Sequence, residues 1–215
     1  LLYRNLSGKY FQSSITPMVW RSTIDSPLTP SRGTMYSASL KYAGGPLGGE
    51  IDVLKPQLEF THYRPLFGRG AKVQSLGFHV QYSLIKSFHG STVPYWEKSF
   101  LGGERSIRGY EVYSIGPRDA SGFNLGGEKM LVFNAEYIIP VGGPLYVIFF
   151  YDRGNTVRAG QALKWGEMYA STGIEARLFI PALRVPFRLI FSYNNRKVYA
   201  DDSDFAFRFA VGTTF

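Results

Sequence analysis

The last eleven residues of the chain, FAFRFAVGTTF (205–215), alternate between two kinds of side chain. Strict alternation with a period of two predicts a β-strand, because successive side chains point to opposite faces. One face carries small or polar residues. The other carries Phe205, Phe207, Phe209, Val211, Thr213 and Phe215. Such a strand suits a membrane β-barrel, which shows apolar residues to lipid and polar residues to its lumen.

The same alternation recurs along the whole chain. Short connections rich in Gly, Pro, Asn and Asp separate most of the alternating stretches, as in antiparallel hairpins. No sustained helical periodicity is present. The sequence therefore predicts an all-β fold, an antiparallel meander of about nine strands. The expected strands are 13–23, 34–43, 51–63, 72–84, 129–140, 145–153, 169–180, 185–194 and 205–215.

The aromatic content favours a transmembrane β-barrel over a soluble one. The chain has 17 Phe, 15 Tyr and 3 Trp, which suits strands and the aromatic girdles of membrane interfaces. A soluble sandwich or barrel would hide its apolar faces inside and show charges outside. Here the apolar faces are wide and aromatic, and the opposite faces carry small polar groups and isolated charges. No stretch approaches about 18 consecutive apolar residues, so no membrane-spanning helix is expected.

Composition argues against several classes of function. The net charge is +8, but the basic residues are scattered singly, whereas nucleic-acid binding requires clustered charge. The chain has no cysteine, which excludes disulfides, thiolate metal sites and a cysteine nucleophile. His62, His79 and His89 lack metal-ligand spacing, and no serine lies in a nucleophile elbow. We expect no catalytic residue, no metal and no cofactor, and we interpret the acids at 201–204 as a solvated turn.

One long segment, 88–128, breaks the strand pattern. It contains FLGGERSIRGY (100–110) and SIGPRD (114–119). A loop arginine is ordinarily a solvated charge, but a guanidinium inside a lumen needs a carboxylate partner. The next two expected strands each place one acid on the lumenal face, Glu136 and Asp152. We therefore expect Arg108 to form salt bridges with these two residues.

The loop motif resembles that of the BamA-type outer-membrane assembly and secretion superfamily (the bacterial surface antigen superfamily). The pattern FLGGE-x-S-[VI]-RG-[FY] followed by SIGPRD is the specific part, and family members more often carry Val where Ile107 stands. Supporting pieces are GGEK (126–129), FNAEYIIP (133–140), FFYDRGN (149–155) and FAVGTTF (209–215). The resemblance implies a loop held in the lumen by acids that pair with its arginine. The implied motif residues are Gly102, Gly103, Glu104, Arg108, Gly109 and Tyr110.

The length of the loop bears on the size of the barrel. An eight-stranded barrel is filled by its own side chains, so a loop of about forty residues cannot enter it. Nine strands then indicate the C-terminal part of a larger barrel, sixteen-stranded if the family pattern holds. The alternative is a trimmed or engineered small barrel with the loop outside. We treat 1–215 as a single partial transmembrane barrel with a lumenal loop at 88–128. Residues 1–10 lack a signal peptide, so we expect the true N-terminus to lie upstream.

The resemblance implies a protein of the bacterial outer membrane that assembles other β-barrel proteins. Substrate strands would be templated at a lateral gate, a seam between the first and last barrel strands. Its implied partners are outer-membrane lipid and lipopolysaccharide, unfolded outer-membrane proteins, and accessory periplasmic or lipoprotein subunits. Two alternatives remain, a polypeptide secretion pore of the same superfamily and a membrane anchor for an upstream enzyme domain, and the upstream sequence would separate them. The expected seam residues in this chain are Phe205, Phe207, Phe209, Gly212 and Phe215.

Overall fold

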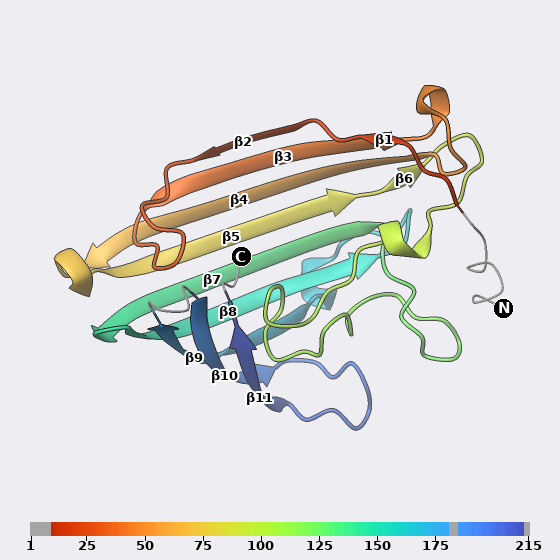
Figure 1. Ribbon diagram of the computed structural model, residues 1–215. Helices are drawn as coiled ribbons and strands as arrows, with labels where there is room; N and C mark the ends of the chain where they lie inside the picture. Colours follow the sequence, from red (N-terminus) through yellow and green to blue (C-terminus); the bar gives the residue numbers. More distant parts are fainter. Residues whose placement is uncertain (1–9, 181–184, 213–215) are drawn as a thin grey trace.

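The chain forms one antiparallel β-sheet of eleven strands in the computed structural model, which describes residues 10–180 and 185–212 (Figure 1). Most strands are long and joined in sequence order by hairpins. The strands are β1 (Ser14–Ile15), β2 (Met18–Ser22), β3 (Gly33–Ala43), β4 (Val53–Phe67), β5 (Gln74–Leu84), β6 (Lys86–Ser87), β7 (Lys129–Gly142), β8 (Leu145–Val157), β9 (Tyr169–Ile180), β10 (Val185–Asn194) and β11 (Phe205–Val211).

The hydrogen-bonded order is β1-β3-β4-β5-β7-β8-β9-β10-β11, with β2 paired to β3 and β6 paired to β4. The sheet is open in the described part of the chain, with β1 and β2 at one edge and β11 at the other. The predicted all-β antiparallel meander is confirmed. Eleven strands replace the nine expected ones because the stretch 13–23 divides around Pro17 into β1 and β2, and because β6 adds a two-residue strand.

Helix in the described residues is confined to four single turns of 3₁₀ helix: η2 (Gly45–Leu47), η3 (Gly70–Lys72), η4 (Tyr95–Glu97) and η5 (Trp165–Glu167). Within residues 10–180 and 185–212, no helix has the length and apolar character needed to cross a bilayer. The β4 strand runs further than its sequence suggests, through Pro65 to Phe67. A register shift between these two residues accommodates the proline, as is usual for proline within a sheet.

The two faces of the sheet differ in burial. On β7, the even-numbered residues from Met130 to Ile138 are buried, and their odd-numbered neighbours are more exposed. We call the buried side the inner face and the opposite side the outer face. On the outer face, the register aligns Phe149, Ile174, Phe191 and Phe207 across four strands, and each is 45–57% exposed.

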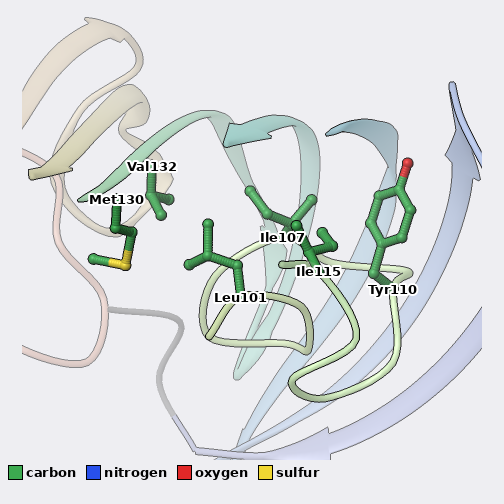
Figure 2. Close-up of a cluster of buried hydrophobic side chains, with 6 residues drawn as sticks. All are labelled: Leu101, Ile107, Tyr110, Ile115, Met130 and Val132. Atoms are coloured by element: carbon green, nitrogen blue, oxygen red, sulfur yellow. The ribbon is translucent and has the colours of Figure 1, made fainter. Parts of the chain in front are cut away.

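The long segment between β6 and β7 packs against the inner face. Isolated bridges pair Ser99 with Gly127 and Leu101 with Ile115, so the loop has its own backbone order. Figure 2 shows strands of the sheet curving around this loop, whose apolar side chains lie beside those of β7. The buried cluster comprises Leu101, Ile107, Tyr110, Ile115, Met130 and Val132.

Candidate functional site

Arg108 lies at the centre of the contact between the loop and the sheet, and its side chain is fully buried. The loop turns sharply on either side of it. Gly102, Gly103 and Gly109 have φ values of 103°, 95° and 89°, a region that residues with a Cβ rarely adopt. The Gly103 amide donates to the Tyr110 carbonyl at 3.0 Å. The glycines therefore fold the segment back on itself and direct Arg108 toward the strands.

Asp152 on β8 accepts two parallel hydrogen bonds from the planar guanidinium of Arg108. Arg108 Nε donates to Asp152 Oδ2 at 2.7 Å, and Nη2 donates to Oδ1 at 2.7 Å. The Arg108 backbone amide also donates to Oδ2, at 3.0 Å. Bidentate, charge-assisted pairs of this kind are the strongest hydrogen bonds that side chains form. Asp152 therefore fixes the position of both the guanidinium and the main chain of the loop.

Glu136 on β7 binds the other end of the guanidinium, since Arg108 Nη1 donates to Glu136 Oε1 at 2.6 Å. The same nitrogen lies 3.2 Å from Glu175 Oε2 on β9. Burial alone would lower the pKa of Arg108, but the charges of Asp152 and Glu136 raise the pKa above its ordinary value. The arginine is therefore a permanent cation joined to three strands.

Two further arginines complete the group of charges. Arg177 on β9 donates from Nε to Glu175 Oε1 at 2.7 Å, and its Nη2 lies 3.4 Å from Glu136 Oε1. Arg188 on β10 donates from Nε and Nη2 to the two oxygens of Glu175, both at 2.8 Å. Three arginines thus face three acids, and the formal charge of the set is zero. We call it the charge cluster: Arg108, Glu136, Asp152, Glu175, Arg177 and Arg188.

The charge cluster lies between two apolar groups on the inner face, which explains how it is kept from water. On one side is the loop cluster of Figure 2, and on the other is a group that includes Ile148, Phe150 and Ile190. The Phe150 ring lies under the guanidinium, with Arg108 Cζ 3.9 Å from its centroid, a cation–π geometry. Asn134 joins loop and cluster by donating to both Ser106 O and Asp152 Oδ1.

The loop is also attached on both sides of Arg108. The Tyr110 hydroxyl lies 2.9 Å from the Arg196 carbonyl oxygen and 3.1 Å from that of Ala170. Nearer the start of the loop, Glu97 pairs with Lys41 and accepts a hydrogen bond from Gln12. These hydrogen bonds offset the effect of burial and lower the pKa of Glu97. The loop therefore contacts strands from β3 to β11, where Arg208 Nη2 lies 3.6 Å from Glu111 Oε1.

Gly109→Ala is expected to destabilise the docked loop by about 2–3 kcal/mol, since the residue has a positive φ and no room for a side chain. A Cβ there would lie 2.2 Å from Ser192 Oγ and 2.5 Å from Asn194 Oδ1. The measurement is the rate of proteolysis within 88–128. Gly122→Ala is the matched control, because Gly122 has φ +83° but nothing within 4 Å of its Cβ position. Equal effects of the two substitutions would show that the contact with β10 is unimportant.

The structure brings together Arg108, Glu136 and Asp152, and the glycines of the motif lie in the turns on either side of Arg108. Glu104 contributes its backbone, since its carbonyl accepts from Arg188 Nη1 at 3.2 Å. Sequence reasoning did not assign Glu175, Arg177 or Arg188 to the site. The signal was present, because these three residues alternate in phase with the polar face of β9 and β10.

The expected seam residues lie apart from the charge cluster, on β11 at the edge of the sheet. The outer-face residues Phe205, Phe207 and Phe209 are 73%, 57% and 56% exposed. Gly212 follows the strand with φ 114°, and its amide donates to Pro186 O at 2.9 Å. Phe215 lies outside the described residues. In the described ranges, no group of three or more His, Asp or Glu side chains is arranged to hold a metal ion.

Comparison with known proteins gives a consistent result. Residues 3–215 match the Omp85 superfamily domain. The chain is 35% identical over 162 residues to the outer membrane protein assembly factor BamA of Nitratidesulfovibrio vulgaris, a match that covers 73% of this chain and 20% of that protein. It is 29% identical over 132 residues to the mouse sorting and assembly machinery component 50 homolog, covering 58% of this chain and 25% of that protein. The chain thus spans a fifth to a quarter of these relatives.

The fold comparison agrees with the sequence matches. The crystal structure of BamA from Haemophilus ducreyi lacking POTRA domains 1–3 superposes with a TM-score of 0.77 at 19% identity, covering 93% of this chain and 42% of that chain. This likeness establishes a shared barrel architecture. The match of residues 3–215 to the Omp85 superfamily domain shows that the chain belongs to the Omp85 superfamily.

Proposed function

We propose that this chain is the C-terminal part of the barrel of an outer-membrane β-barrel assembly factor. The chain is a protein of the bacterial outer membrane. The relatives that it matches are named as assembly factors or sorting and assembly components, which favours assembly over secretion or anchoring. In this proposal residues 1–215 form one partial transmembrane barrel, of sixteen strands when complete, and 88–128 is its lumenal loop.

The observation that carries the proposal is the contrast between the charge cluster and β11. The cluster ties β7, β8, β9 and β10 to one loop through buried ion pairs, so this part of the wall is rigid. β11 has seven residues, pairs with β10 alone in the described chain, and is followed by Gly212, which has a positive φ. In the complete barrel, this edge would become a template for another strand wherever β11 separates from its neighbour.

The proposed action requires no covalent chemistry. Adding a strand to an edge forms backbone hydrogen bonds. In a bilayer, each backbone N–H or C=O group left unpaired costs several kcal/mol. Templating at the seam would let a substrate strand pair before it meets lipid. The expected substrates are unfolded outer-membrane proteins, and the expected partners are lipid and accessory periplasmic or lipoprotein subunits bound through upstream domains. We propose that the protein is not an enzyme, has no cofactor and binds no nucleic acid.

The proposal is tested with the full-length protein in liposomes. Unfolded eight-stranded barrel proteins are added, and their folding is followed by the shift in electrophoretic mobility of folded barrels. We expect folding to be at least tenfold faster than in empty liposomes. Release of an unfolded polypeptide on the far side of the membrane would instead indicate a secretion pore. Neither activity would indicate an anchor, and either of these results would overturn the proposal.

A further inference from the structure

Two charged residues, Lys129 and Arg153, lie on the outer face of β7 to β11 within the described ranges. The other outward residues of these strands are apolar, aromatic or uncharged polar. An arginine on the lipid face of a barrel costs about 2–4 kcal/mol at the middle of the bilayer and close to nothing at the interface. Arg153 must therefore either lie at the interface or have a partner that repays its burial.

The position of Arg153 along β8 places it at the interface. A barrel strand crosses the hydrocarbon layer with about 9–11 residues, and Arg153 is the ninth residue of β8 from Leu145. It lies toward the end of β8 that adjoins the long loop 88–128. Long loops of outer-membrane barrels are extracellular and their short turns are periplasmic, so Arg153 is at the level of the outer-leaflet headgroups.

Aromatic groups hold the Arg153 guanidinium in place on the outer face. Nη1 donates to the Tyr151 hydroxyl at 2.8 Å, and Nη2 donates to the Trp165 carbonyl oxygen at 2.6 Å. The Trp165 ring covers the guanidinium, with Arg153 Cζ 4.6 Å from its centroid, and Phe133 packs edge-on against that ring. Neutral neighbours thus fix the orientation of the Arg153 guanidinium.

Arg153 has no carboxylate within 4.0 Å among the described residues, in contrast to the arginines of the charge cluster. Its Nε is buried and has no hydrogen-bond partner there. The protein uses one N–H group of Nη1 and one of Nη2, so the second N–H group on each of these nitrogens is left for a ligand. A permanently charged, planar donor of this kind matches the oxygens of a phosphate.

We infer that Arg153 binds a phosphate group of an outer-leaflet glycolipid, lipid A of lipopolysaccharide, at the rim of the barrel. A phosphate at this depth supplies the missing counter-charge without leaving the headgroup layer. Lys129 adds a second cation two outer-face rows nearer the long loop, on the neighbouring strand. This role is distinct from barrel assembly, since it concerns how the wall is seated in the membrane.

The test uses the full-length protein in nanodiscs of phosphatidylcholine that contain lipid A, with bound lipid A counted by native mass spectrometry. Arg153→Met replaces the cation by an unbranched apolar group that a lipid-facing site tolerates. We expect it to weaken binding of bisphosphorylated lipid A about tenfold, the effect of losing one charge-assisted hydrogen bond. Binding of dephosphorylated lipid A should not change.

Lys197→Met is the matched control, because Lys197 is an exposed cation of the loop between β10 and β11 and its removal changes net charge equally. It should leave lipid A binding unchanged. Equal binding by wild type and Arg153→Met, or equal losses in both variants, would overturn the inference. If Arg153→Met fails to fold, Arg153→Lys decides, since it keeps the charge without the planar fork. A severalfold loss supports the phosphate site, and full binding contradicts it.

Discussion

Arg108→Ala is expected to release the long loop from the sheet. The substitution removes both bidentate bonds to Asp152 and the bond to Glu136, and it leaves the charge cluster with a net charge of −1. Breaking a buried ion pair from one side costs about 3–5 kcal/mol. The undocked state should therefore be populated more than about a hundredfold over wild type. Cleavage within 88–128 by proteinase K, applied to the folded full-length protein, measures this population.

Arg105→Ala is the matched control for this experiment. Arg105 lies three residues upstream in the same loop, is exposed, and forms no ion pair with the described residues, so its removal should leave cleavage unchanged. Asp152→Asn should have a milder effect than Arg108→Ala, because the arginine keeps Glu136 and Glu175 and the amide oxygen can still accept. Protection of the loop in Arg108→Ala equal to that in wild type would contradict the structural role of the charge cluster.

Much of the fold could be predicted because the two faces of a β-strand appear in the sequence as an alternation of apolar and polar residues. The alternation around Phe133 and Glu136 separates an outer residue from an inner one, and the structure keeps that assignment. The ends of strands were less predictable. Pro65 and Pro17 have no amide hydrogen to donate, so their effects depend on local register. β4 continues past Pro65 with a shift, whereas Pro17 divides β1 from β2.

The charge cluster was predictable in part. Arg108 stood out through its motif, and Glu136 and Asp152 through their phase on the two strands that follow. Glu175 has the same phase on β9, but no local pattern tells how far across a sheet a single guanidinium reaches. Arg177 and Arg188 were visible as inner-face cations, yet their pairing with Glu175 follows from the register of β9 and β10. When Arg108 is removed, Glu136 therefore keeps its ion pair with Arg177. The two acids predicted from the sequence, Glu136 and Asp152, are not both left unpaired.

Arg153 shows a different limit of sequence reasoning. Its odd phase places it on the outer face, but alternation alone makes it resemble an error in the pattern. The orientation of its guanidinium is set by Trp165, which lies twelve residues later in a loop. The Trp165 ring and carbonyl oxygen both contact the guanidinium. Contacts between a strand and a loop have no period, so a three-dimensional structure is needed to see them.

The second large effect is expected from closing the seam at β11. If substrate strands are templated there, β11 must separate from the first strand of the complete barrel. Ala206→Cys places a thiol on a small inner-face residue of β11, and a second cysteine is introduced opposite it on the first strand. Because the chain has no cysteine of its own, it adds no competing thiol. A disulfide tolerates Cα separations of about 4.4–6.8 Å and would hold the two strands in register.

The matched control keeps Ala206→Cys and moves its partner to the other side of β11. Ser192 on β10 is directly opposite Ala206 in the register, so Ser192→Cys forms a disulfide that leaves the seam free. Both oxidised proteins should remain folded, as judged by electrophoretic mobility without heating. In the control, the disulfide ties β11 to β10. In the seam-locked protein, it ties β11 to the first strand of the complete barrel, from which β11 must separate.

The most direct measurement is the rate at which oxidised seam-locked protein in liposomes folds unfolded β-barrel substrates, before and after reduction. We predict that locking lowers the rate to that of empty liposomes, that reduction restores it, and that the β10–β11 control folds substrates at the wild-type rate throughout. Folding at the wild-type rate by the locked protein would contradict templating at the lateral seam.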